Sequence, residues 1–144
     1  MSVQTAFQKY AQFLENLTIE DIPSLNKFVA DDVLFTDPFH HVKGLENMSN
    51  IFINLFEKVT DITFSVGKYA TNGSTVYFNW NLNGNLLGKP WDVKGVTRLE
   101  FNKKKQIIEH TEYWDSASQF YEKFPIIGPL LRYFRRRISN QLTS

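Results

Sequence analysis

Residues 76–83, Val-Tyr-Phe-Asn-Trp-Asn-Leu-Asn, alternate strictly between large apolar side chains and more polar ones. A period of two residues is typical of a β-strand that buries one face and exposes the other. Residues 62–66 alternate in the same way before this stretch, and residues 91–101 do so after it. The Asn-Gly pair at 72–73 predicts a tight hairpin turn. We therefore expect a long antiparallel meander over residues 60–115.

The residues before the meander have a helical period, interrupted by one short strand. Apolar residues recur every three or four positions, as on one face of a helix. The predicted elements are helices over residues 7–17, about 20–29 and 45–58, a strand at 33–36 and an irregular loop at 37–44. Helix resumes near Ser116 and is broken by Pro125. Helices grouped before a meander indicate an α+β fold.

Size and composition exclude several classes of protein. The chain has 144 residues, 42% hydrophobic and 22% charged, which is typical of a globular domain. We expect a single domain over residues 1–144, with a helical extension at 116–144. A formal net charge of +1 gives no reason to expect nucleic-acid binding. The absence of cysteine excludes disulfides and a cysteine nucleophile. The aromatic content of 15% is high and needs an explanation.

The two ends of the chain bear on its location. The first residues have no signal-peptide pattern and no run is long enough to span a membrane, so we expect a cytoplasmic protein. Residues 129–144 carry four Arg and no acidic residue, beside an apolar stripe of Leu131, Phe134 and Ile138. Such a helix either lies on an anionic membrane or packs on its own domain. We expect the second and no membrane association, because four arginines are few for a lipid site.

Asp37 is the single residue that most suggests chemistry. It ends a strand directly before Pro38 and an aromatic residue, where a partly buried carboxylate would serve as a general base. The alternative is an ordinary Asp-Pro turn. The neighbouring histidines at 40–41 could join His110 and a carboxylate in a metal site, but their spacing matches no known ligand pattern. We expect no metal and no cofactor.

The order of these elements resembles the nuclear transport factor 2-like superfamily. The resemblance rests on Val-Leu-Phe-Thr-Asp-Pro-Phe at 33–39, Gly-Leu-Glu-Asn-Met at 44–48 and the four long strands that follow. Residues 28–39 are similar to its SnoaL-like and ketosteroid-isomerase-like branches. Residues 109–115 and 124–132 resemble a bacterial SnoaL-like group with no agreed activity. The resemblance implies a cone: a strongly curved, mixed but mostly antiparallel sheet around a pocket, with N-terminal helices and a C-terminal helical extension.

The resemblance also implies roles for individual residues. Asp37 matches the general base of ketosteroid isomerases, and Tyr10 is similar to the tyrosine that donates a hydrogen bond to the dienolate oxygen. Thr97 falls at or near the second donor, where the family has a protonated Asp, and a hydroxyl is the weaker donor. His110 and Glu112 would face the cavity and share a proton. The alternatives are a core tyrosine and a merely structural His–Glu pair.

Aromatic residues would wall the implied pocket and account for part of the high aromatic content. The expected lining residues are Phe39, His40, Trp80, Trp91 and Trp114. We therefore predict a pocket for a small apolar ligand with a carbonyl group, and proton transfer beside that carbonyl if the protein is an enzyme. The alternative is a non-catalytic ligand-binding or protein-interaction domain. A homodimer is expected, through an outer sheet face that carries Tyr77, Asn79, Asn81 and Asn83.

Overall fold

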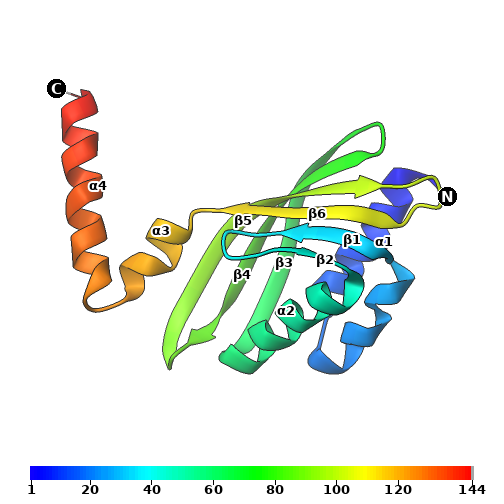
Figure 1. Ribbon diagram of the computed structural model, residues 1–144, viewed down its shortest axis with the longest axis horizontal. Helices are drawn as coiled ribbons and strands as arrows, with labels where there is room; N and C mark the ends of the chain where they lie inside the picture. Colours follow the sequence, from blue (N-terminus) through cyan, green and yellow to red (C-terminus); the bar gives the residue numbers. More distant parts are fainter. Residues whose placement is uncertain (144) are drawn as a thin grey trace. The chain divides into compact units, whose positions relative to one another are not determined.

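The computed structural model describes residues 1–143, which form two compact units divided between Tyr113 and Trp114 (Figure 1). The first unit contains α1 (Val3–Glu15), the 3-10 helix η1 (Ile19–Lys27), β1 (Val29–Thr36), β2 (His41–Lys43), α2 (Leu45–Lys58), β3 (Val59–Asn72), β4 (Thr75–Leu86), β5 (Lys89–Phe101) and β6 (Ile107–Trp114) except for its last residue. The second unit contains α3 (Ser116–Gln119), η2 (Tyr121–Lys123) and α4 (Ile127–Thr143).

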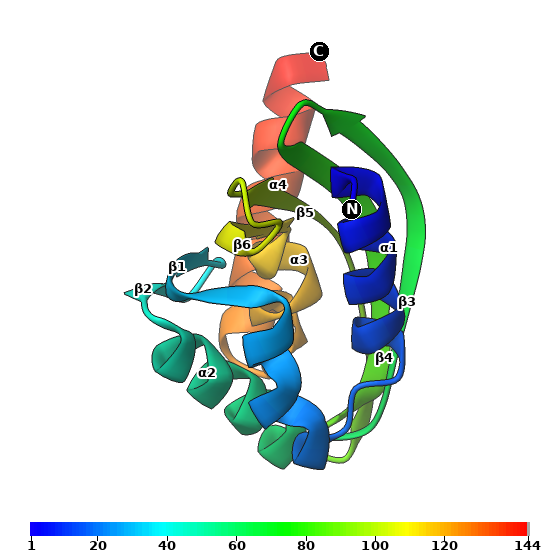
Figure 2. The same cartoon turned by 90° about the vertical axis from the view of Figure 1, so that its right-hand side faces the viewer.

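The six strands form one mixed sheet in the order β2-β1-β6-β5-β4-β3. Strand β1 runs parallel to β6 and antiparallel to β2, whereas β3, β4 and β5 form the predicted antiparallel meander. Figure 2 shows β3 and β4 curving around α1. The predicted α+β class with a curved, mixed sheet is confirmed.

Irregular pairing explains how β3 bends. Its register against β4 shifts between Thr60 and Thr63, and again between Val66 and Tyr69. At each place three steps along β3 match two steps along β4, which is a β-bulge, and bulges bend a strand and increase its twist. The bend brings the inner face of the sheet onto α1, where the Phe7 ring lies 4.7 Å from Tyr69 and 5.1 Å from Phe78, centroid to centroid.

The alternation in β4 divides inner from outer residues as the sequence predicts. The buried residues are Val76, Phe78, Trp80 and Leu82, and the exposed ones are Tyr77, Asn79, Asn81 and Asn83. The same strand parity buries Trp91, Val93, Thr97 and Leu99 in β5. The inner face of the sheet is therefore apolar except for a few polar side chains.

The segment around residues 28–43 differs from the prediction in two ways. The helix expected to reach Val29 ends at Lys27 as a 3-10 helix, and β1 begins at Val29 rather than at Val33. Val29 pairs with Ile107 of β6, a contact between distant parts of the chain that local helical periodicity cannot reveal. The loop expected at 37–44 contains β2, which pairs back onto β1.

Gly95 in β5 allows the ring of Trp80 to pack directly on the sheet. A Cβ at position 95 would lie 2.4 Å from Cζ2 of Trp80 and 2.8 Å from the Tyr113 carbonyl oxygen. We expect Gly95→Ala to lower the free energy of unfolding by about 1–3 kcal/mol, because the tryptophan cannot move freely in a packed core. Urea denaturation measures this. Gly67→Ala is the control, since its Cβ would meet Asn79 at an ordinary 3.4 Å; equal losses in both variants would contradict the account.

In the second unit, Glu122 holds the start of α4. Its side chain is buried, its carboxylate lies 3.1 Å from Nη2 of Arg135, and its carbonyl accepts a hydrogen bond from Nη1 of Arg132 at 2.6 Å. Gly128 permits this contact, because a Cβ there would lie 2.2 Å from the same carbonyl oxygen. The first turns of α4 are thus fixed to η2.

Candidate active site

His110 lies in the interior of the first unit, on β6. It is 1% exposed, and its ring packs among Phe35, Phe52 and Tyr10, with centroids 5.2, 6.3 and 5.9 Å away. Strand β6 supplies the histidine, β1 and α2 supply the phenylalanines, and α1 supplies the tyrosine. The parallel pairing of β1 with β6 places His110 beside Phe35 in register. Two predicted site residues 100 positions apart in the chain are therefore in contact.

This interior contains polar atoms without protein partners. Among the described residues, Oη of Tyr10 and both ring nitrogens of His110 are buried and make no hydrogen bond. The nearest carboxylate oxygen, Oε1 of Glu112, is 3.9 Å from Nδ1 of His110, which is too far for a hydrogen bond. Buried polar groups are nearly always hydrogen-bonded, and an unsatisfied one costs about 1–3 kcal/mol. These atoms are suited to receive a polar group from outside the chain.

The same burial keeps the cluster uncharged at neutral pH. Desolvation lowers the pKa of His110 to about 3. Burial raises the pKa of Glu112 to about 8, and the negative charge of Asp37 raises it as well. Burial, followed by the charge of Glu112, raises the pKa of Tyr10 well above its usual value. Near pH 7, Tyr10 and Glu112 each carry an O–H that can donate a hydrogen bond.

Asp37 follows β1 and forms the turn that its position before Pro38 suggests. Its Oδ1 accepts hydrogen bonds from the backbone N–H groups of Phe39 at 2.8 Å and His40 at 2.7 Å, which is an Asx turn. Nδ1 of His40 lies 2.9 Å from Oδ1 and 3.1 Å from Oδ2. The side chain of Asp37 is 10% exposed and its charge acts on Glu112. The backbone N–H groups of the turn bond to Oδ1, so Oδ2 can still accept a further hydrogen bond.

Thr97 is buried on the inner face of β5 and is bonded to a tryptophan. Nε1 of Trp80 donates to Oγ1 of Thr97 at 2.8 Å. The threonine therefore satisfies the indole N–H, and its own O–H remains available for donation. The bond also fixes the Trp80 ring, whose centroid lies 5.6 Å from that of Phe64.

The expected lining residues have different surroundings. Trp80 and Trp91 are buried on the inner sheet face. Phe39 is 41% exposed and His40 is exposed, both on the loop that Asp37 begins. Trp114 is half-buried and is the first residue of the second unit. The first unit thus brings two of the three tryptophans to the inner face.

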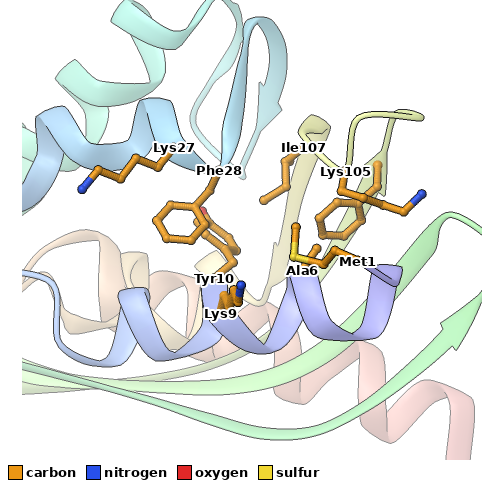
Figure 3. Close-up of a pocket in the computed structure, with 9 residues that line it drawn as sticks. Met1, Ala6, Lys9, Tyr10, Lys27, Phe28, Lys105 and Ile107 are labelled. Atoms are coloured by element: carbon orange, nitrogen blue, oxygen red, sulfur yellow. The ribbon is translucent and has the colours of Figure 1, made fainter.

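A cavity of about 180 Å³ lies beside Tyr10, and its lining does not include His110 (Figure 3). It is lined by Met1, Ala6, Lys9, Tyr10, Lys27, Phe28, Phe101, Lys105 and Ile107. Except for Tyr10, sequence reasoning did not select these residues for a site. They come from four separate elements and from residues between them, so no local pattern connects them.

The three histidines lie in different surroundings. Within residues 1–143, no group of three His, Asp or Glu side chains is placed to hold a metal ion. His41 lies on β2 with Nδ1 2.8 Å from Oγ1 of Thr36.

No helix in the described part of the chain is long and apolar enough to cross a membrane.

Known structures share this fold at low sequence identity. An NTF2-like protein of unknown function from Burkholderia pseudomallei K96243 is 13% identical, with a TM-score of 0.70 over 81% of this chain and 94% of that one. An LEH-like epoxide hydrolase from M. tuberculosis is 14% identical, with a TM-score of 0.66 over 82% and 86% of the chains. A hypothetical protein with a ketosteroid isomerase-like fold from Catenulispora acidiphila DSM 44928, in complex with trimethylamine, is 18% identical, with a TM-score of 0.67 over 82% and 88%.

A family model supplies the assignment that the structural likenesses alone do not. No curated protein matches the chain. The model of the SnoaL-like domain matches residues 10–110, from the tyrosine of α1 to the buried histidine of β6. The match spans most of the chain and agrees with the fold, so the resemblance drawn from the sequence is confirmed. The chain belongs to the SnoaL-like family, within the nuclear transport factor 2-like fold.

Proposed function

We propose that the first unit binds a small, mainly apolar molecule with a carbonyl group and moves a proton beside that carbonyl. The observation that carries this proposal is that hydrogen-bond donors and a charged carboxylate lie near one another in the first unit. Tyr10 and Glu112 are neutral donors near pH 7, while Asp37 lies close enough for its charge to act on Glu112. A neutral O–H donor near a carboxylate is one arrangement that acid–base catalysis uses.

The chemistry follows from these protonation states. Asp37 takes a proton from the carbon next to the carbonyl, and the C–H electron pair moves into the carbon–carbon bond while the carbonyl oxygen becomes an enolate. Tyr10 and Glu112 donate hydrogen bonds to that oxygen, and Thr97 offers a further hydroxyl. Protonated Asp37 then returns the proton to the same or a conjugated carbon. Donors placed in a water-poor interior stabilise such a charge more strongly than water does.

The surroundings favour an apolar ligand body. The phenylalanines around His110 and the buried rings of Trp80 and Trp91 give the inner face hydrocarbon and aromatic surface. Ligand sites are typically apolar with a few polar groups that fix orientation. Among proteins of this fold, one is described as an epoxide hydrolase and another is in complex with trimethylamine. Both descriptions concern small molecules, which agrees with a small-molecule site in this fold.

A non-catalytic binding domain is the second candidate. The Asx turn at Asp37 already occupies Oδ1, and such a turn has a structural role without chemistry. The exposed outer face of β4, with Tyr77 and its row of asparagines, suits a second copy packed sheet to sheet. We propose a cytoplasmic homodimer under either function, and gel filtration with light scattering tests the dimer.

Proton exchange separates the two candidates. Incubation with cyclohexanone or a medium-chain β-keto ester in D2O is expected to replace the α-protons with deuterium faster than buffer alone, as followed by proton NMR. Exchange at the buffer rate, with either probe shown to bind by ligand-observed NMR, supports the non-catalytic candidate instead.

A further inference from the structure

Helix α4 carries a stripe of large apolar side chains that its own unit leaves uncovered. Leu130, Phe134, Ile138 and Leu142 follow one another at intervals of four residues and are between 51% and 81% exposed. Ile127 begins the same stripe at 49% exposure. Residues at this spacing lie on one face of a helix. Contiguous exposed apolar surface of this kind marks an interaction site.

The charges of α4 all have one sign. Its 17 residues include four arginines and no acidic residue. By the helical period, Arg135 and Arg137 flank the apolar stripe on its two sides, and Arg136 lies opposite it. Arg135 is paired with Glu122, but no carboxylate among the described residues pairs with Arg136 or Arg137. The side chain of Arg137 instead donates to the Tyr133 hydroxyl at 3.2 Å.

The start of this helix is held by its own unit. The Glu122 contacts involve Arg132 and Arg135, and every residue from Tyr133 to Leu142 is exposed. An apolar stripe beside uncompensated arginines is therefore displayed along more than two helical turns. The anchoring presents the stripe in a defined orientation relative to η2.

We infer that α4 docks on the surface of a membrane rich in anionic lipid, with the apolar stripe among the acyl chains, the flanking arginines at the phosphates and Arg136 within reach of the anionic surface potential. The number of arginines alone favoured packing on the chain's own domain, whereas the exposed apolar stripe beside them favours the membrane. A helix with these two faces lies in the interface plane of a bilayer. A nucleic acid would match the arginines and leave the stripe in water. A second copy packed stripe to stripe would bring the flanking arginines of both helices together, which is repulsive. The inference is independent of the proposed catalysis.

Vesicle co-sedimentation tests the docking. The full chain is expected to bind phosphatidylcholine vesicles that contain half phosphatidylglycerol, with at least about tenfold weaker binding to pure phosphatidylcholine. Arg136→Gln with Arg137→Gln is expected to weaken anionic binding by about tenfold or more, at roughly a factor of five per charge near the surface. Lys103→Gln with Lys104→Gln removes the same charge from the exposed β5–β6 hairpin and is the matched control, with binding unchanged.

A second variant separates hydrophobic insertion from charge. Replacement of Phe134, Ile138 and Leu142 with Gln keeps every arginine, and the exposure of these side chains means that folding is unaffected. Binding is expected to be lost. The inference is overturned if neither vesicle sediments the chain, if both vesicles bind it equally, or if the two charge variants lose the same affinity. A dimer that this Gln variant dissociates would overturn it in favour of a second copy.

Discussion

Asp37→Asn is expected to lower the rate of α-proton exchange by about 10²–10⁴-fold, the usual contribution of a general base. An amide cannot accept the proton, yet its oxygen still accepts the two backbone hydrogen bonds of the Asx turn, so the loop is preserved. Ligand affinity should change little, because Asp37 acts on the proton and leaves the carbonyl to other donors. Exchange rates in D2O and a binding isotherm for the same ketone measure the two effects.

Asp32→Asn is the control for this change. Asp32 is exposed on β1, the strand that leads to Asp37, and its replacement removes the same charge without reaching the interior. The control should exchange at the parental rate. Equal rates in the parent and in Asp37→Asn would remove Asp37 from the base role, and a loss of affinity equal to the loss of rate would make it a binding residue.

The second large effect is on stability at alkaline pH. The pKa of Glu112 is about 8 in the folded protein and 4.5 as a reference, so the folded state holds one more proton in this range. Its contribution to the free energy of unfolding therefore falls by roughly 1 kcal/mol per pH unit as the pH rises from 4.5 to 8. Glu112→Gln removes this loss. The free energy of unfolding of the variant minus that of the parent, from urea denaturation, should therefore rise steadily as the pH is raised from 5 to 8.

The pH profile of the parent also contains an opposite contribution. Burial holds the pKa of His110 at about 3 against a reference of 6.5, so the folded state resists protonation and stability falls as the pH drops through this range. Between pH 4.5 and 6.5 the two groups offset each other. Glu57→Gln, on the exposed side of α2, is the control and should run parallel to the parent. A parallel profile for Glu112→Gln would contradict a half-buried carboxyl that is neutral near pH 7.

The local pattern of apolar and polar residues was sufficient to predict an element where one face of that element packs on the core. The alternation of β4 predicted its buried and exposed residues, and the apolar stripe of residues 45–58 matched α2. The start of β1 was missed because Val29 pairs with Ile107, nearly eighty positions away, and the parallel pairing replaced the expected last turn of helix. Tertiary pairing of this kind overrides local propensity.

The sequence predicted the candidate site only in part. Strand parity left both faces of β6 with apolar and charged residues, and the family resemblance was needed to place His110 inward. The contact of Tyr10 with His110 depends on how α1 lies against β6, which no spacing encodes. The hydrogen bond from Trp80 to Thr97 likewise joins two strands. The Asx turn at Asp37 was predictable, because Asp before Pro favours a turn and its partners are local.

The most direct test of the account is a carbon-13 NMR titration of the Glu112 side-chain carboxyl in the full chain, assigned by comparison with Glu112→Gln. Burial beside the charge of Asp37 predicts a midpoint near pH 8, with the carboxyl still protonated at pH 7 and able to donate to an enolate oxygen. A midpoint near the reference value of 4.5 would show an ionised, solvated carboxylate and would contradict the proposed donor cluster.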